Sequence, residues 1–174
     1  MENQKTSLKQ IATTYGMLLA LLSILVLVVM YVGNIEKSWT ISIISFGLTV
    51  LIFVYALKAY KHGNGYYLTL GEALKVGMAT AAIGGVVAAI YAYIHYTFIY
   101  PEYIDTILDQ ARMEMSEQSQ GMTEEQMEQA IGFTESFTTP FMMATFSLIG
   151  TLFFGFIISL VAGLIMKRER PSEM

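Results

Sequence analysis

The sequence predicts an all-α membrane protein, a bundle of four transmembrane helices with a helical hairpin between the third and the fourth. Three observations predict it. The chain of 174 residues is 55% apolar and only 14% charged, so a soluble fold would lack the polar residues to cover its core. Four apolar runs are each long enough to cross a bilayer, which takes about 20 residues. The charged residues are also sorted between the two sides of these runs.

The four runs cover about residues 11–32, 39–57, 70–96 and 140–166, within one membrane domain of residues 1–174. The first run is expected to be retained, because it is too long for a signal peptide and has no small-residue cleavage site. The connection to the second run is short enough to require antiparallel neighbours. Thr69 and Glu72 form a capping box at the start of the third run, and Thr139 with Pro140 begins the fourth.

Lysine and arginine near the ends of the runs predict the orientation, because bases collect on the cytoplasmic side. Only Lys37 and Arg112 fall on the other side. Both termini are therefore expected in the cytoplasm of a bacterium, with the chain in the inner membrane and residues 97–139 in the periplasm. The eight bases on the cytoplasmic side are Lys5, Lys9, Lys58, Lys61, Lys75, Lys167, Arg168 and Arg170.

Residues 97–139 are predicted to form a helical hairpin rather than an open loop. Apolar side chains recur there at helical spacing, and Thr123 with Gln126 has the spacing of a capping box for the second helix. The segment holds most of the acids of the chain, which are expected to form a solvated face. They are Glu102, Asp105, Asp109, Glu114, Glu117, Glu124, Glu125, Glu128 and Glu135.

Small residues recur at every fourth position in the third and fourth runs. Such rows let two backbones approach closely, which matters in lipid because hydrophobic exclusion does not drive helix association there. The two rows are expected to pack against each other, with a homodimer contact as the alternative. They comprise Ala73, Gly77, Ala81, Gly85 and Ala89 in the third run and Ser147, Thr151, Gly155, Ser159 and Gly163 in the fourth.

Glu72 and Lys75 lie three residues apart, so they are expected to face each other as an ion pair at the membrane interface. Capping and snorkelling explain these two charges. The other interpretation, a proton or ion relay, would need further ionisable groups deeper in the bundle. Residues 76–94 contain none.

His95 lies among five tyrosines at the end of the third run, where an aromatic belt is expected. A soft metal site is the alternative, since thioethers suit Cu(I), but methionine also fills adaptable apolar surfaces. No catalytic, cofactor or metal site is therefore assigned, and cysteine chemistry is excluded because the chain has no cysteine. The methionines concerned are Met113, Met115, Met122, Met127, Met142 and Met143.

Four segments carry a resemblance to a known family: LGEALKVG at residues 70–77, YPEY at 100–103, GMTEEQ at 121–126 and TLFFGFIIS at 151–159. With them the chain resembles the domain-of-unknown-function 4199 family, uncharacterised inner-membrane proteins common in Bacteroidota. The resemblance implies four spans and a location in the bacterial envelope. It implies no activity for any residue.

The expected function is that of a non-enzymatic membrane protein whose periplasmic hairpin binds or regulates another envelope protein, or a second copy of the chain. The alternative is a small transporter or metal-handling protein that uses the methionines and His95. An intramembrane enzyme is the third class, and no nucleophile with a nearby base supports it. Beyond the lipid bilayer and such a protein partner no ligand is expected, and nothing in the sequence indicates nucleic acid.

Overall fold

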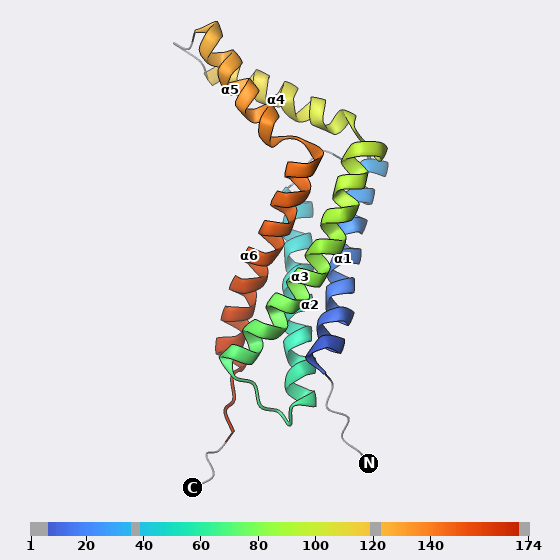
Figure 1. Cartoon of the computed structure of the whole chain (residues 1–174), viewed down its shortest axis with the longest axis vertical. Coiled ribbons are helices and arrows are strands. Elements are labelled where there is room, and N and C mark those ends of the chain that lie inside the picture. Colours follow the sequence, from blue (N-terminus) through green and yellow to red (C-terminus); the bar gives the residue numbers. More distant parts are fainter. Residues whose placement is uncertain (1–6, 36–38, 119–122, 171–174) are drawn as a thin grey trace. The chain divides into compact units, whose positions relative to one another are not determined.

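The computed structural model describes residues 7–35, 39–118 and 123–170, and for residues 117 and 118 only the backbone. Four of its helices are long and apolar enough to cross a membrane (Figure 1). The chain is therefore an all-α, multi-pass membrane protein, which confirms the predicted fold class. These four helices are α1 (Leu8–Val32), α2 (Trp39–Gly63), α3 (Leu70–Ile94) and α6 (Pro140–Met166), and between α3 and α6 lie η1 (His95–Ile99), α4 (Glu102–Gln118) and α5 (Glu124–Phe137).

The chain divides into two compact units. Residues Met1–Ala88 and Ser147–Met174 form the four-helix unit, and residues Ala89–Phe146 form the hairpin unit. The division passes through α3 and α6, so each of these helices contributes to both units.

The helices differ at their ends from the predicted spans. α2 continues to Gly63, six residues past the predicted end at 57. Basic side chains near a helix C-terminus interact favourably with the helix dipole, and Lys61 and His62 lie in the last turn of α2. Long basic side chains also extend from the apolar surface to water. α1 begins at Leu8, where the Ser7 side chain accepts a hydrogen bond from the Gln10 amide at 3.2 Å. α3 passes into a π-helical turn, η1, closed by a 2.8 Å bond from the Tyr100 amide to the His95 carbonyl.

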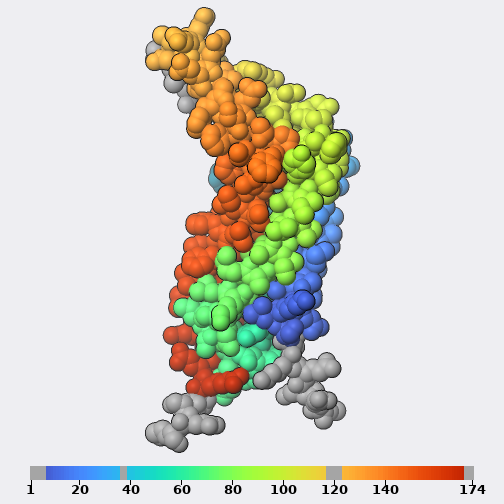
Figure 2. All heavy atoms as spheres, viewed as in Figure 1, coloured from blue at the N-terminus to red at the C-terminus, as the bar shows by residue number. Residues whose placement is uncertain are grey.

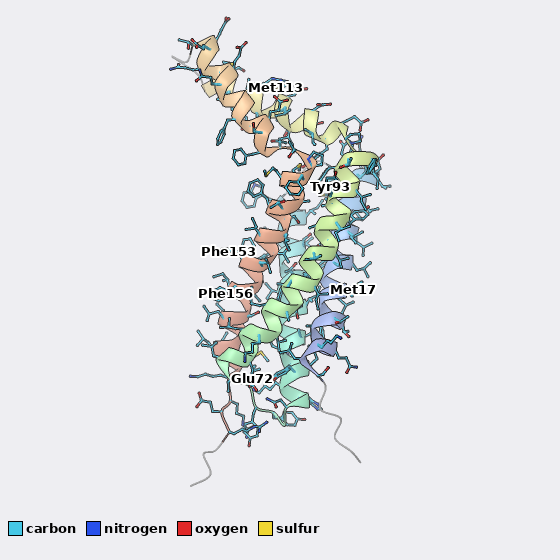
Figure 3. The ribbon with its side chains drawn as sticks, viewed as in Figure 1. Met17, Glu72, Tyr93, Met113, Phe153 and Phe156 are labelled. Atoms are coloured by element: carbon cyan, nitrogen blue, oxygen red, sulfur yellow. The ribbon has the colours of Figure 1, made fainter. Side chains whose placement is uncertain are left out.

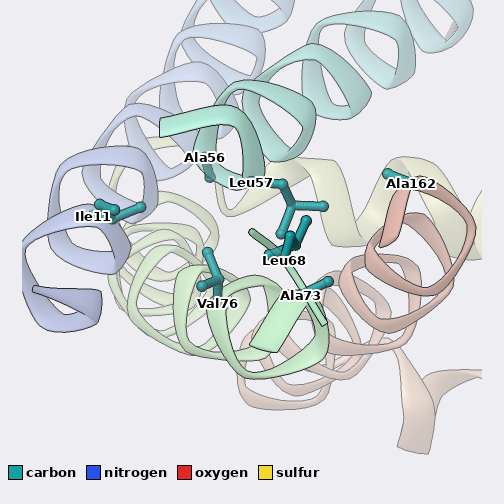
Figure 4. Packing of buried hydrophobic residues seen from close by; sticks show 7 residues of the cluster. All are labelled: Ile11, Ala56, Leu57, Leu68, Ala73, Val76 and Ala162. Atoms are coloured by element: carbon teal, nitrogen blue, oxygen red, sulfur yellow. The ribbon is translucent and has the colours of Figure 1, made fainter. Parts of the chain in front are cut away.

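The buried core of the four-helix unit lies toward the end where α1 begins. Its larger cluster joins all four helices and the segment before α3 (Figure 4). A second cluster lies further along the bundle, around Leu19, Phe53, Ala81 and Ile158. Both clusters use small residues as well as large ones, which keeps the helices close. The larger cluster consists of Ile11, Ala56, Leu57, Leu68, Ala73, Val76 and Ala162.

Large apolar side chains cover the outside of the four-helix unit. Met17, Phe153 and Phe156 project outward from α1 and α6 (Figure 3), with 49%, 59% and 41% of their surfaces exposed. The buried residues of α1 end at Ala20 and those of α2 begin at Phe53, so the remaining halves of both helices are apolar without being buried. A soluble protein would not tolerate so much exposed apolar surface, whereas lipid covers it.

In the hairpin unit, α4 and α5 pack against each other and bury Leu108. α5 begins with a capping box. The Thr123 amide donates to the Gln126 side-chain oxygen at 3.0 Å, and the Gln126 amide donates to the Thr123 hydroxyl at 3.3 Å. Glu124 and Glu125 occupy the first turn of α5, where the helix dipole favours negative charge.

Candidate functional site

The small residues of α3 and α6 meet in antiparallel order in the four-helix unit, where the two helices lie side by side (Figure 1, Figure 2). A Cβ built on Gly155 would lie 2.7 Å from the Ala81 Cβ, and one built on Gly163 would lie 2.7 Å from the Ala73 Cβ. At Gly77 a Cβ would overlap the Ser159 side chain. No larger side chain fits at these glycines without moving a neighbour.

The row ends at Gly85, whose built Cβ would lie 2.9 Å from a Leu148 methyl and 3.2 Å from a Thr151 methyl. Four residues of α3 thus contact the small residues of α6 or their neighbours. The remaining two members of the predicted rows lie elsewhere, since Ser147 is exposed and Ala89 belongs to the hairpin unit.

A second close contact, between α1 and α3, is absent from the sequence-based prediction. A Cβ on Gly84 would lie 2.6 Å from the Gly16 carbonyl, and one on Gly16 would lie 3.0 Å from Ile83 and from the Thr80 carbonyl. The adjacent glycines therefore pack against different helices: Gly84 against α1 and Gly85 against α6. The paired glycines in the sequence were the available signal for this contact.

Two buried hydroxyls lie on α3 and α6. Within the described ranges, neither the Thr80 nor the Ser159 hydroxyl has a hydrogen-bond partner, although both side chains are 0% exposed. Other hydroxyls in the spans bond to the carbonyl four residues earlier, as Ser23 does to Leu19 at 3.0 Å. Burying an unpaired hydroxyl costs about 1–3 kcal/mol, so close packing along the row must offset this cost.

The most elaborate polar arrangement of the four-helix unit is centred on Glu72, in the first turn of α3 (Figure 3). One carboxylate oxygen accepts from the Thr69 amide at 2.8 Å and from the Thr69 hydroxyl at 3.0 Å. The other accepts from the Asn64 side-chain amide at 3.1 Å and from the Tyr60 hydroxyl at 3.4 Å. One oxygen therefore caps α3 while the other ties α3 to the end of α2.

The same arrangement holds the segment that follows α6. Leu68 and Arg168 exchange two backbone hydrogen bonds of 2.9 and 2.8 Å as an isolated antiparallel bridge. The Arg170 guanidinium donates to the Asn64 side-chain oxygen at 3.0 Å. Both arginines also lie over the Tyr67 ring, 5.6 and 5.7 Å from its centroid. We call these residues, with Tyr60, Thr69 and Glu72, the Glu72 cluster.

Lys61 adds a further tie from α2. Its ammonium donates to the Met166 carbonyl at 2.7 Å, and so satisfies a carbonyl at the last turn of α6. The turn between α2 and α3 is shaped for these contacts, with Gly65 and Tyr66 at φ values of 69° and 66°. Glycine takes this left-handed conformation without cost, whereas tyrosine does not.

The ion pair expected between Glu72 and Lys75 does not form. Lys75 is exposed, and within the described part of the chain the ion pair found is Arg112 with Asp109 at 2.9 Å. The reason is that both oxygens of Glu72 are already bound by neutral donors: one by Thr69 of its own helix cap, the other by Tyr60 of α2 and by Asn64 just after α2. The spacing of three residues permitted the pair but did not require it.

In the hairpin unit, His95 is 2% exposed and lies among tyrosine rings. Its ring centroid is 5.6 Å from that of Tyr91, 5.3 Å from Tyr96 and 6.4 Å from Tyr100. Tyr103 stacks on Tyr96 at 5.2 Å, and burial, with a smaller contribution from Tyr100, raises the pKa of Tyr103 above its usual value. These rings make a packed aromatic cluster around the π-helical turn.

The methionines of the hairpin unit are not enclosed with His95. Met113 is 64% exposed on α4 (Figure 3), in contrast to the buried histidine. Met115, Met127, Met142 and Met143 are half-buried on three different helices, and Met122 lies outside the described residues. Among the residues that the structure describes, no three His, Asp or Glu side chains are grouped to hold a metal ion.

Comparison with known proteins gives a family but no activity. No curated protein and no solved structure matches the chain. A family model described as "Protein of unknown function (DUF4199)" matches residues 14–168, which include nearly all of the four spans and the whole hairpin. The chain therefore belongs to the DUF4199 family.

Proposed function

We propose that this protein is a non-enzymatic component of the bacterial inner membrane whose hairpin, on the periplasmic side, binds a basic surface of another envelope protein. One observation carries the proposal. Every described acid of α4 and α5 is exposed, and of these only Asp109 has an ion-pair partner within the described ranges. The exposed acids are Glu102, Asp105, Asp109, Glu114, Glu124, Glu125, Glu128 and Glu135.

Such a surface is suited to recognition rather than to chemistry. Exposed like charges repel one another, and a basic partner relieves that repulsion. Charge complementarity of this kind mainly accelerates association and makes it dependent on salt. The helices present the acids on a folded surface, because α4 and α5 are packed together and α5 is capped at Thr123.

The proposed orientation rests on the distribution of lysine and arginine, and it is tested by cysteine labelling. The chain has no cysteine, so single replacements are clean reporters. Gln129→Cys on α5 and Glu169→Cys after α6 are both exposed positions. In intact spheroplasts an impermeant maleimide is expected to label the first and to label the second only after lysis. The reverse pattern would contradict the orientation.

Partner binding is tested by cross-linking in native membranes. With a photo-activatable residue at position 129, in place of Gln129, a cross-link to a partner is expected, and its yield should fall as the salt concentration rises. Replacing Glu114, Glu124 and Glu128 by lysine should reduce the cross-link about ten-fold or more, since like charges then face the partner. Glu169→Lys, an exposed acid outside the hairpin, is the matched control. A cross-link that survives the triple reversal would overturn the proposal.

A further inference from the structure

The hairpin unit has an apolar aromatic face that packing within the unit does not cover. Phe133 is 68% exposed and Phe137 is 44% exposed, both on α5. Their ring centroids lie 4.7 Å apart. Phe137 in turn stacks on Phe146 of α6, at 6.2 Å and with 49% of Phe146 exposed. The three rings, which we call the Phe ladder, form a continuous row from α5 into a membrane span.

The Phe ladder lies on the side of α5 that faces away from three of its four acids. Phe133 and Phe137 are four residues apart and share a face, at 100° per residue. Glu124, Glu128 and Glu135 fall about 140–200° around the helix from Phe133, whereas Glu125, in the first turn, falls about 80° from it. Ile131, which is half-buried, lies about 160° around the helix from Phe133. α5 therefore has an acidic side and an aromatic side.

The chain also limits how far the Phe ladder extends from the membrane. Phe137 is three residues before Pro140, the first residue of the α6 span, so it lies within about 10 Å of that residue. Phe133 is one helical turn further, about 6 Å along α5. The headgroup region on each side of a bilayer is about 5–8 Å thick, given the core and total thicknesses. The Phe ladder thus begins in the span, and the chain keeps Phe133 within about 16 Å of the first residue of that span.

We propose that the Phe ladder seats the end of α5 in the lipid headgroup region on the hairpin side of the membrane. Aromatic side chains favour this region, and helices that lie in it bury phenylalanine toward the acyl chains. The occupant is lipid because the row is continuous with Phe146, an exposed side chain of a membrane span. α5 has no lysine or arginine, so the contact is apolar, and Glu124, Glu128 and Glu135 are on the side of α5 turned away from it.

This contact would fix the hairpin relative to the membrane surface and would hold its acidic side toward the aqueous phase. It does not depend on whether a protein partner exists. The two proposals can therefore fail separately. If the Phe ladder does not contact lipid, a salt-dependent cross-link to a partner is still expected. If no partner exists, the lipid contact is still expected.

Tryptophan fluorescence tests the proposal, because Trp39 is the only tryptophan of the chain. In a Trp39→Phe background, the full chain carrying Phe133→Trp is reconstituted into phosphatidylcholine vesicles with or without bromine atoms on the upper part of the acyl chains. The emission of this tryptophan is expected to be about two-fold lower in the brominated vesicles, as contact quenching requires burial near the headgroups.

Glu135→Trp in the same background is the matched control. Position 135 is nearer to α6 along the chain than position 133, yet it is exposed on the opposite side of α5. Its emission is expected to be unchanged by bromine. Equal quenching at both positions, or none at position 133, would overturn the proposal. Emission at position 133 that is blue-shifted, unaffected by bromine and dependent on protein density would show that a second copy covers the Phe ladder instead.

Discussion

Gly155→Leu is expected to destabilise the protein by about 3 kcal/mol or more, the upper part of the range for overpacked cores. Even the first carbon of a side chain at this position would lie 2.7 Å from the Ala81 Cβ and 3.0 Å from the Phe53 ring. Both neighbours are 0% exposed and belong to the same core cluster. Because the obstacle includes an alanine with no freedom to rotate away, α6 must move from α3 for the larger residue to fit.

Gly150→Leu is the matched control, because it is in the same helix and a Cβ there meets nothing within 4 Å. The intrinsic gain from replacing a helical glycine is the same at both sites, up to about 1 kcal/mol. Thermal unfolding in mild detergent, followed by circular dichroism, should therefore show a lower Tm for Gly155→Leu and an equal or higher Tm for Gly150→Leu. Equal effects at the two positions would contradict the close approach of α3 and α6.

The fold class could be predicted from the sequence because its causes are local and repeated. A run of apolar residues long enough to span lipid must satisfy its backbone hydrogen bonds internally, and so must be helical. The rows of small residues were visible for the same reason, since a repeat of four residues marks one inclined ridge of a helix. In the four-helix unit, Gly77 and Gly155 lie where α3 and α6 leave no room for a Cβ atom.

The contacts that could not be predicted depend on residues distant in sequence. The spacing predicts Lys75, three residues away, as a partner of Glu72, but Tyr60 of α2 and Asn64, which follows α2, bind its carboxylate instead. Nothing in the local sequence gives the approach of α2 to the start of α3. Leu68 and Arg168, which pair through their backbones, are far apart in the sequence, and no periodic pattern of residues predicts their pairing.

The Phe ladder was missed for a different reason. Phe133 and Phe137 have the helical spacing of a face, but the predicted hairpin was interpreted through the apolar residues that pack α4 against α5. Exposure separates the two sets, since Ile131 is half-buried and Phe133 is 68% exposed. Sequence alone does not distinguish an apolar residue that faces a neighbouring helix from one that faces lipid.

Replacement of Glu72 is expected to have the second large effect, and the choice of substitution separates its two roles. Glu72→Ala removes all four hydrogen bonds and should cost about 3 kcal/mol, because bonds to a charged acceptor contribute about 1.5–3 kcal/mol each and are not additive. Glu72→Gln keeps an oxygen for the Thr69 amide, as glutamine is accepted in capping boxes. Its amide group, however, presents N–H donors to the Asn64 NH2 group, which is itself a donor, whereas the Tyr60 hydroxyl can turn and accept.

Glu72→Gln should therefore leave the start of α3 protected while loosening the turn between α2 and α3. Amide hydrogen exchange in detergent is the measurement: exchange should accelerate at Tyr66 and at Arg168, whose backbone bonds belong to the turn and to the bridge. Lys75→Ala is the control, expected to be nearly silent in both exchange and Tm because Lys75 is exposed and is not paired with Glu72. If Lys75→Ala destabilises the protein as much as Glu72→Ala does, the ion pair exists in the membrane protein and the neutral donors of the Glu72 cluster are secondary.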